Sequence, residues 1–546
     1  MRRRSTLLAV LLALAIVPYF IDLGGSAIWD ANEAFYVETP RQMLERGDYI
    51  TPSFNDEPRI NKPVLSYWIV AGFYHLFGVS VGVERLAIAL GAMVIIACGA
   101  VLGRIAAQQL GPAGRGAAIL AALALASLPR LLMLGRRIFI DIWITAFMSL
   151  TLVFFALSER DPNRRRLFLG LMYGAAGLGV LTKGPVALVL PALAFLLYLL
   201  IQGELRRLRE MMLPLGALIV GLIVLPWYAA LYHAHGWEYI RSFIVSENLE
   251  RYMAGYGVNQ DRSLWFYIPV LFGDSFPLSP VLIAAAAAAL RERDRFTVLL
   301  WCWVAVFVGF FSLSAGKQDL YIFPTIAAIV GLIAAAIERG RLRPEWRAWA
   351  NGTMAVAAFV TAAAGIGVLW LFSTAGRIYA LHGAVAVGAF ALIGGVAALA
   401  LMRAKRPEAA VLALLTAMIA INWTFVLRVL PSFERFKPAP AIARTLESRL
   451  APGDAVAYYE VALPSLVYYL RHRVDTYFEE RALIDALHTP RRVFVVLSER
   501  DYQALAPSIG TPTCVIDRFE TFDVKLRAIL RREPLPRLVL ITNRCP

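Results

Sequence analysis

A small set of basic residues stands in or beside long apolar stretches of the 546-residue chain, where positive charge is costly. Lys183 lies in the stretch Leu181-Thr-Lys-Gly-Pro185, and Lys317 is followed four residues later by Tyr321, a spacing that places both on one face of a helix. Ammonium and guanidinium groups at low dielectric neutralise a phosphate strongly. The pattern predicts a phosphate site at a membrane boundary, with these candidate ligands: Arg59, Lys62, Lys183, Arg251, Lys317 and Tyr321.

Acidic residues form a second set on the same predicted face of the membrane. Asp30 and Glu33 follow the first apolar run, and Asp141 begins a later run after the basic pair Arg136 and Arg137. A carboxylate near the membrane boundary indicates function by default, as a general base or as the partner of a cationic group. The candidate catalytic acids are therefore Asp30, Glu33 and Asp141, and the candidates for the acceptor side are Glu84, Arg136 and Arg137.

Each of these charges has a plainer explanation when taken alone. A basic side chain at a boundary can extend to the interface or bind lipid head groups without specificity, and Glu84 can pair with its neighbour Arg85. His233 and His235 form an isolated pair, more consistent with interfacial polar groups than with metal ligands. No cofactor is required by the sequence, and a divalent cation is compatible with it but not predicted.

Membrane-spanning helices must position these residues. Hydrophobic residues make up 59% of the chain and charged residues 17%, against about 45–50% and about 25% in soluble domains. Apolar runs long enough to cross roughly 30 Å of hydrocarbon recur up to residue 430, and they predict about thirteen spans. The expected fold class is a polytopic α-helical membrane protein with a small α/β domain after the last span.

The positive charge orients these spans. A net charge of +15 would suit a nucleic-acid partner, but groups of three or four basic residues fall in alternate short loops on the side of the N-terminus, as the positive-inside rule requires of cytoplasmic loops. We therefore predict a cytoplasmic N-terminus, a C-terminus on the opposite face and no nucleic-acid partner. The basic loops are 160–166, 206–209, 291–295, 339–343 and 403–406.

Three longer segments lie on the outer face. Two are loops of a membrane domain at 1–430, at about residues 24–83 and 235–265, and the third is a soluble α/β domain at 431–546. In the first loop Val64–Gly78 reads as a partly immersed helix. Strands are predicted at Ala455–Glu460, Arg492–Ser498 and Arg537–Thr542, with helices at 480–488 and 524–532. Cys514 and Cys545 can pair if this domain faces an oxidising compartment.

The order of short motifs between residues 29 and 321 resembles that of the integral-membrane C-type glycosyltransferases that use polyprenyl-phosphate sugar donors, in the branch related to the protein O-mannosyltransferases. Within that branch the chain is most similar to the bacterial lipid A 4-amino-4-deoxy-L-arabinose transferases. The matching stretches are Trp29-Asp-Ala-Asn-Glu33-Ala-Phe-Tyr36, Arg41-Gln-Met-Leu-Glu-Arg-Gly-Asp48, Asn61-Lys-Pro63, Tyr67-Trp68, Asp141, Gly179-Val-Leu-Thr-Lys-Gly-Pro185, Pro226-Trp-Tyr228, Asn248-Leu-Glu-Arg251, Trp265-Phe-Tyr267 and Gly316-Lys317 with Tyr321.

The resemblance implies a C-type glycosyltransferase fold in the bacterial inner membrane, with the small α/β domain in the periplasm. It implies inverting transfer of 4-amino-4-deoxy-L-arabinose from undecaprenyl phosphate to a phosphate of lipid A. The partners would be this lipid-linked donor, lipid A and membrane lipids. The candidate cations would bind the carrier phosphate, and the acids would serve the acceptor or act as base.

One motif departs from the family pattern. Relatives carry adjacent aspartate and glutamate in the first loop, where this chain has Asn32 and Glu33 with an aspartate displaced to Asp30. The departure leaves the identity of the base open. Two other functions also stay open at this point: transfer to a protein hydroxyl or another envelope glycan, and lipid or solute transport, which the large outer loops and the soluble tail disfavour.

Overall fold

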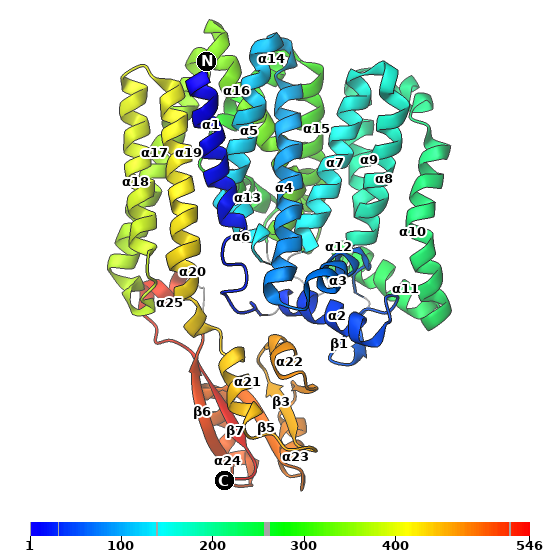
Figure 1. The fold of residues 1–546 in the computed structure, drawn as a ribbon, viewed down its shortest axis with the longest axis vertical. Helices are drawn as coiled ribbons and strands as arrows, with labels where there is room; N and C mark the ends of the chain where they lie inside the picture. The colour runs from blue at the N-terminus through cyan, green and yellow to red at the C-terminus, as the bar shows by residue number, and fades with distance from the viewer. Residues whose placement is uncertain are drawn as a thin grey trace.

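A computed structural model describes residues 2–30, 32–59, 61–137, 140–255, 262–522 and 526–545. Long helices stand side by side in a bundle, and a small mixed domain lies beyond one end of it (Figure 1). The bundle helices are α1 (Arg2–Ile16), α4 (Val81–Ala106), α5 (Arg115–Ser127), α6 (Pro129–Gly135), α7 (Ile140–Arg160), α8 (Arg165–Lys183), α9 (Val186–Ile201), α10 (Leu213–His235), α13 (Tyr267–Asp274), α14 (Val281–Glu292), α15 (Arg295–Leu313), α16 (Ile326–Leu342), α17 (Pro344–Ser373), α18 (Ala384–Arg403) and α19 (Pro407–Thr424).

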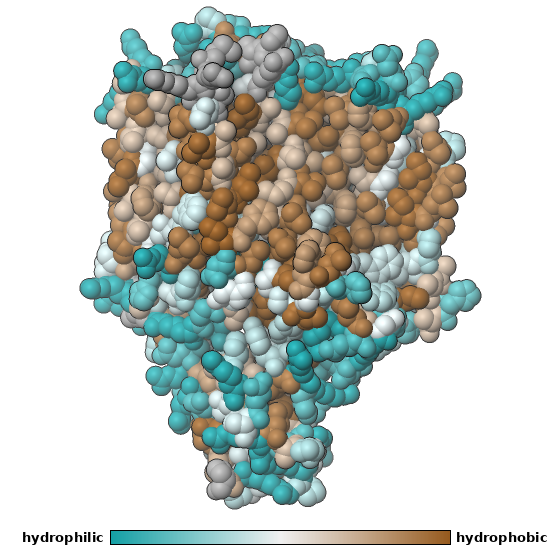
Figure 2. Space-filling view, in the orientation of Figure 1, coloured by the Kyte–Doolittle hydropathy of each residue, from teal (hydrophilic) through white to brown (hydrophobic). Residues whose placement is uncertain are grey.

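The bundle has the dimensions and the surface of a membrane domain. Within the described residues, eight helices are long and apolar enough to cross a membrane, or nine if the bent pair α5 and α6 forms one span. Their apolar side chains form a hydrophobic belt between two polar zones (Figure 2). The polytopic α-helical class is confirmed, whereas the total of about thirteen spans stays a prediction because several apolar helices, such as α9, are short for a crossing.

A buried carboxylate joins the basic loops at the end of the bundle away from the small domain. The side chain of Glu159 is 1% exposed, and it pairs with Arg165 at 3.1 Å, Arg207 at 2.6 Å and Arg295 at 3.0 Å. Three guanidinium groups offset the cost of burying one carboxylate. These arginines, predicted only to orient the spans, therefore also tie together the loops that follow α7, α9 and α14.

Two outer segments cover the end of the bundle nearest the small domain (Figure 1). The first holds α2 (Asn32–Arg46), a ribbon of β1 (Ser53–Phe54) and β2 (Glu57–Pro58), and α3 (Leu65–Phe77), which confirms the predicted helix at Val64–Gly78. The second holds α11 (Trp237–Ile244), a π-helical turn at Val245–Glu250 and α12 (Arg251–Ala254). Such π-helical turns are rare and are frequent at functional sites.

The small domain is built on a five-stranded mixed sheet. The strand order is β4-β3-β5-β7-β6, with β3 parallel to both of its neighbours and β7 antiparallel to β5 and β6. The predicted strands are confirmed as β3, β5 and β7. The elements that follow α19 are α20 (Leu430–Ser432), α21 (Ala439–Glu447), β3 (Ala455–Tyr459), α22 (Ser465–Leu470), β4 (Val474–Tyr477), α23 (Glu480–Leu487), β5 (Val493–Ser498), α24 (Glu499–Ile509), β6 (Cys514–Glu520), α25 (Leu526–Arg531) and β7 (Arg537–Thr542).

Two features of the edge strand β6 fasten the domain. Cys514, its first residue, forms a disulfide with Cys545, which follows the neighbouring strand β7. The connection from β6 to β7 returns to the bundle, where α25 lies near the ends of α17 and α18 (Figure 1). There Ile529 packs with Tyr379 and Phe436 in a small apolar cluster. The domain is thus held at the membrane boundary by more than the chain connection after α19.

The turn of the β1–β2 ribbon docks on the free edge of β4. Asn55 has a φ of +55°, a left-handed conformation that asparagine adopts more readily than most residues. Its side chain donates to the Val474 carbonyl at 2.8 Å and accepts from the Val474 N–H at 2.9 Å. A single side chain therefore pairs with β4 much as a neighbouring strand would.

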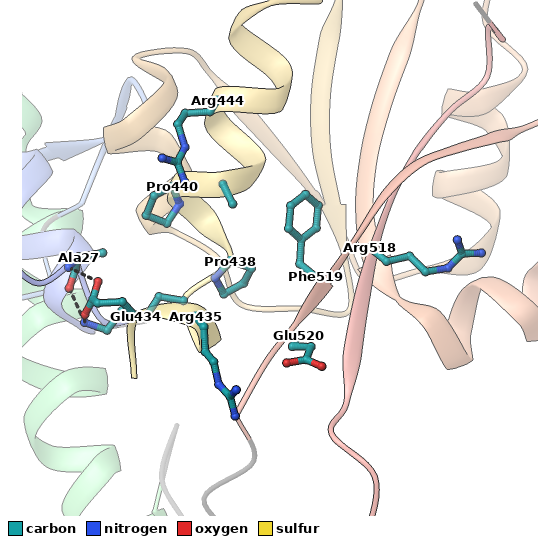
Figure 3. A pocket seen from close by; sticks show the side chains of 11 residues that line it. Ala27, Glu434, Arg435, Pro438, Pro440, Arg444, Arg518, Phe519 and Glu520 are labelled. Atoms are coloured by element: carbon teal, nitrogen blue, oxygen red, sulfur yellow. Dashed lines mark hydrogen bonds and ion pairs between the residues drawn. The ribbon is translucent and has the colours of Figure 1, made fainter. Parts of the chain in front are cut away.

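A second contact joins the first outer segment to the linker after α19. Glu434 accepts hydrogen bonds from the Ala27 N–H at 2.8 Å and from the Ser26 hydroxyl at 2.7 Å, and Lys437 donates to the Ala27 carbonyl at 2.7 Å. Burial lowers the pKa of Lys437 to about 8. A cavity of about 490 Å³ opens beside these contacts, between the linker and β6 (Figure 3).

Replacing Asn55 with alanine should loosen the small domain. The variant loses two hydrogen bonds and leaves the polar groups of Val474 unpaired, at a cost of about 2 kcal/mol, or a roughly thirtyfold larger undocked fraction. The rate of amide hydrogen exchange at Ala27, whose N–H donates to Glu434 at 2.8 Å in the docked domain, measures this fraction. Glu57→Ala is the matched control, because its 2.9 Å pair with Arg473 is exposed on both sides and contributes little. Equal exchange rates in the two variants would contradict the docking role of Asn55.

Candidate functional site

Lys183 and Asp141 meet where two neighbouring helices reach the outer end of the bundle. Lys183 is the last residue of α8, Asp141 lies in the first turn of α7, and their charged groups form an ion pair. The ring centroid of Tyr321 lies 5.6 Å from the Lys183 ammonium group. The structure thus brings together three of the predicted site residues, from three separate parts of the chain.

Gly184 lets the second outer segment approach this ion pair. Its φ of +109° ends α8 in a conformation that favours glycine. A Cβ atom there would lie 2.9 Å from Phe243 of α11. The glycine that follows Lys183 therefore serves both to turn the chain and to admit α11 and the π-helical turn beside the lysine.

A second charged group adjoins the first. Glu247, in the π-helical turn, binds Lys62 at 2.8 Å and Arg251 at 3.1 Å. Burial lowers the pKa of Lys62 to about 8; the positive charges of Arg251 and Lys183 lower it further, and Glu247 opposes them. The π-helical turn that carries Glu247 lies against Gly184, the residue after Lys183, because a Cβ atom at Gly184 would lie 3.4 Å from Oδ1 of Asn248 in that turn. The two charged groups are therefore adjacent, and together we call them the cation cluster: Lys62, Lys183, Arg251, Asp141 and Glu247.

Aromatic residues of the first outer segment line this cluster. Tyr36 of α2 is stacked on Tyr67 of α3 with ring centroids 5.4 Å apart. Burial raises the pKa of Tyr36 well above its ordinary value, and the charges of Arg59, Asp141 and Glu247 all act on it. Arg59 itself lies over the ring of a neighbouring aromatic residue. Tyr36 is thus a neutral phenol beside the cation cluster.

Sequence reasoning missed both Glu247 and Tyr36 as site residues. Tyr36 stands in a motif that matched the family, and Glu247 precedes Arg251 by four residues, the spacing of a helical ion pair. That spacing could have predicted the ion pair between Glu247 and Arg251. It does not, however, reveal that Lys62 shares the same carboxylate.

Lys317 lies in a loop and not on the helix that its spacing to Tyr321 predicted. The prediction that it shares a helical face with Tyr321 is wrong, because the helical turn begins only at Asp319. The loop before that turn is held by Tyr252, whose carbonyl accepts from the Ala315 N–H at 2.9 Å. Lys317 is buried and donates to the Ser314 carbonyl at 2.7 Å. The loop that carries Lys317 is thus bonded to Tyr252, the residue after Arg251. The role of Lys317 as a phosphate ligand stays a prediction.

The two first-loop acids hold the outer segments in place. Glu33 is 2% exposed and pairs with Arg85 at 3.0 Å, so Arg85 does not form the ion pair with Glu84 that was the plainer explanation of that acid. Asp30 accepts hydrogen bonds from the backbone and hydroxyl of Ser465, at 2.7 Å and 2.6 Å. Burial raises the pKa of Asp30 to about 6, and these hydrogen bonds oppose the rise. Both acids are engaged by structural partners, and their catalytic role stays a prediction.

The predicted acceptor-side residues lie next to this loop. Arg136 donates to the carbonyls of Ile21 at 2.6 Å and Asp22 at 3.1 Å, which occupies its guanidinium group. Arg137 lies 4.6 Å from the ring centroid of Trp29. Glu84 is fully buried, and both of its carboxylate oxygens lack a hydrogen-bond partner among the described residues. The assignment of Glu84, Arg136 and Arg137 to the acceptor side stays a prediction.

The histidine pair contributes a structural contact. His235 lies 2.8 Å from the hydroxyl of Thr51, which joins the second outer segment to the first. No group of three or more histidine, cysteine, aspartate or glutamate side chains among the described residues is arranged to hold a metal ion.

The chemistry available to the cation cluster is the binding of an oxyanion. Three positive side chains, from the first outer segment, α8 and α12, stand against two carboxylates. Preorganised cations at low dielectric stabilise negative charge that develops on a leaving group. The side-chain exposures of Lys62, Lys183 and Arg251 are 16%, 20% and 23%, so the cations are partly buried yet reachable.

The chain is similar to proteins whose names describe transferases of sugars carried on lipid phosphates. A family model described as dolichyl-phosphate-mannose-protein mannosyltransferase matches residues 61–229. An undecaprenyl phosphate-alpha-4-amino-4-deoxy-L-arabinose arabinosyl transferase of Pectobacterium carotovorum is 32% identical over 381 residues, covering 67% of this chain and 66% of that protein, just under two thirds of its length. The protein of the same name from Pseudomonas aeruginosa strain LESB58 is 32% identical over 378 residues, covering 68% of this chain and 67% of that protein.

The fold of this chain matches that of a solved structure over almost its whole length. The crystal structure of ArnT from Cupriavidus metallidurans bound to undecaprenyl phosphate matches with a TM-score of 0.79, over 99% of this chain and 98% of that chain, at 22% identity. The C-type glycosyltransferase fold implied by the motif order is therefore confirmed. The chain belongs to the family of undecaprenyl phosphate-aminoarabinose arabinosyl transferases, which are membrane glycosyltransferases that use lipid-linked sugar donors.

Proposed function

We propose that this protein transfers 4-amino-4-deoxy-L-arabinose from undecaprenyl phosphate to a phosphate group of lipid A. The family supports the donor and the reaction. The observation that carries the proposal to the residues is the cation cluster, in which Lys62, Lys183 and Arg251 converge at the outer end of the bundle. We assign this cluster to the carrier phosphate of the donor.

The cation cluster suits an inverting displacement. An oxygen of the acceptor phosphate attacks the anomeric carbon, the bond from that carbon to the carrier phosphate breaks, and the carrier phosphate leaves with the electron pair. One negative charge thereby moves from the acceptor to the carrier. Fixed cations that bind the leaving phosphate would supply most of the rate enhancement. Because these cations provide the required charge, a divalent cation is not part of the proposal.

Among the three candidate acids, the contacts favour Asp141 for a role next to the reacting groups. It pairs with Lys183 inside the cation cluster, whereas Glu33 pairs with Arg85 and Asp30 with Ser465. An acceptor phosphate is already ionised at neutral pH, so no strong base is needed. We propose that Asp141 orients Lys183 and attracts the amino group of the donor sugar.

The proposed location is the bacterial inner membrane, with the N-terminus in the cytoplasm and the small domain in the periplasm. The basic loops gathered at the far end of the bundle support this orientation. The disulfide between Cys514 and Cys545 supports an oxidising compartment for the small domain. A periplasmic site would meet both lipid substrates from the outer leaflet.

The acceptor can be identified in cells. Lipid A extracted from a strain that expresses the protein should carry an added aminopentose on a phosphate, and lipid A from a strain without the gene should lack it. Mass spectrometry of the two extracts makes the comparison. An unmodified lipid A together with a modified protein or glycan would show that the acceptor was assigned wrongly.

Lys183→Ala should reduce transfer by at least about a hundredfold, because it removes a cation that stabilises the leaving phosphate. Transfer is measured with purified protein and a lipid-linked aminopentose donor. Arg241→Ala is the matched control, since Arg241 lies in α11 with a side chain that is 62% exposed and lies 3.8 Å from the exposed Glu238. Full transfer in the Lys183 variant would overturn the phosphate assignment.

Transfer should decline as the pH rises from 7 to 9. Lys62 has a pKa of about 8, so it loses its positive charge in this range, while the donor phosphodiester keeps one negative charge. Lys62→Arg should keep the charge and flatten the decline, since arginine stays protonated. The shape of the rate profile, normalised at pH 7, is the readout. An identical decline in the wild type and the variant would exclude Lys62 as its cause.

A further inference from the structure

Glu247 holds an unusual place in the cation cluster. One of its carboxylate oxygens, Oε2, binds both Lys62 at 2.8 Å and Arg251 at 3.1 Å. Its side chain is 15% exposed, and it is carried by the π-helical turn between α11 and α12. A negative charge therefore stands on the two cations that we assign to the carrier phosphate.

Such a carboxylate opposes any phosphate that binds the same cations. The repulsion between two negative charges at low dielectric grows with the charge of the bound anion. The donor is a phosphodiester with one negative charge. The product, undecaprenyl phosphate, is a phosphomonoester whose second pKa is about 6, so it carries nearly two negative charges at neutral pH. Glu247 should therefore weaken the binding of the product more than that of the donor.

We propose that Glu247 is a positioning residue that makes the cation cluster prefer the singly charged donor over the doubly charged product, and that it thereby promotes product release. This inference rests on the proposed function, because it takes the bound anion to be the carrier phosphate. The transfer itself raises the charge on the carrier by one unit. The same step that completes the reaction thus increases the repulsion from Glu247.

A purely structural role for Glu247 makes the opposite prediction. If its only task were to hold Lys62 and Arg251 together, its loss would let the two cations separate and weaken the binding of every anion. The sign of the change in product affinity therefore separates the two roles. Glu250 offers a matched control, since it belongs to the same π-helical turn but is exposed.

The experiment compares Glu247→Gln and Glu250→Gln with the otherwise wild-type protein; all three are full-length proteins in detergent and carry Lys62→Arg. Glu247 raises the pKa of Lys62, whereas an arginine at this position stays protonated when the carboxylate is lost. Binding of undecaprenyl phosphate and its inhibition constant against the donor are measured, together with the donor KM. For Glu247→Gln we expect about tenfold tighter product binding, or about 1.4 kcal/mol, with a smaller change in donor KM. The first turnover should be retained, while steady-state turnover falls because product release slows. Glu250→Gln should match the protein that carries Lys62→Arg alone.

Weaker product binding in Glu247→Gln, or equal tightening for donor and product, would overturn the proposal, as would an equal effect of Glu250→Gln. Glu247→Ala provides a second variant that removes the charge without introducing an amide, and we expect the same direction. Lys62→Ala separates this inference from the proposed function. If Lys62→Ala weakens the binding of undecaprenyl phosphate and Glu247→Gln does too, only the inference fails. If Lys62→Ala has no effect on binding, the phosphate assignment and the inference both fail.

Discussion

The buried ion pair between Glu33 and Arg85 fixes the outer end of the molecule. Both side chains are at most 3% exposed, and Arg85 also donates to the carbonyls of Leu23, Ser26 and Ala27. A buried charge left without its partner costs several kcal/mol, so neither residue can be lost alone. The pair holds the first outer segment against α4. That segment carries the docking contacts of the small domain and one wall of the cation cluster, so both depend on it.

The cation cluster solves a second electrostatic problem at the same boundary. Three positive side chains in a partly buried place repel one another, and Asp141 and Glu247 reduce this repulsion while fixing the geometry of the cations. The arrangement has a cost, because every carboxylate placed there also repels the anion to be bound. An enzyme that must release a more highly charged product than the donor it binds can make use of that cost.

The sequence predicts the elements that depend on apolar runs and on local charge, but not the contacts between side chains far apart in the chain. The spans, the strands β3, β5 and β7 and the unusual outer cations follow from apolar runs and from the rule for basic loops. The short strand β4 and the edge strand β6 were missed because Asp475 and Asp517 interrupt their apolar pattern. Nothing in the spacing of Lys62 indicates that it meets Glu247, and Lys317 leaves the expected helix because Tyr252 holds its loop.

The departure of the first-loop motif from its relatives becomes intelligible in these terms. Glu33 cannot leave Arg85 to act as a base without exposing a buried guanidinium group, and Asp30 is held by Ser465 across the domain junction. A reaction that needed a strong base in this loop would not tolerate Asn32. A phosphate acceptor needs none, because its attacking oxygen is already ionised. The demand on the protein then shifts from removing a proton to binding and releasing charge on the carrier, which is the task that we propose for the cation cluster.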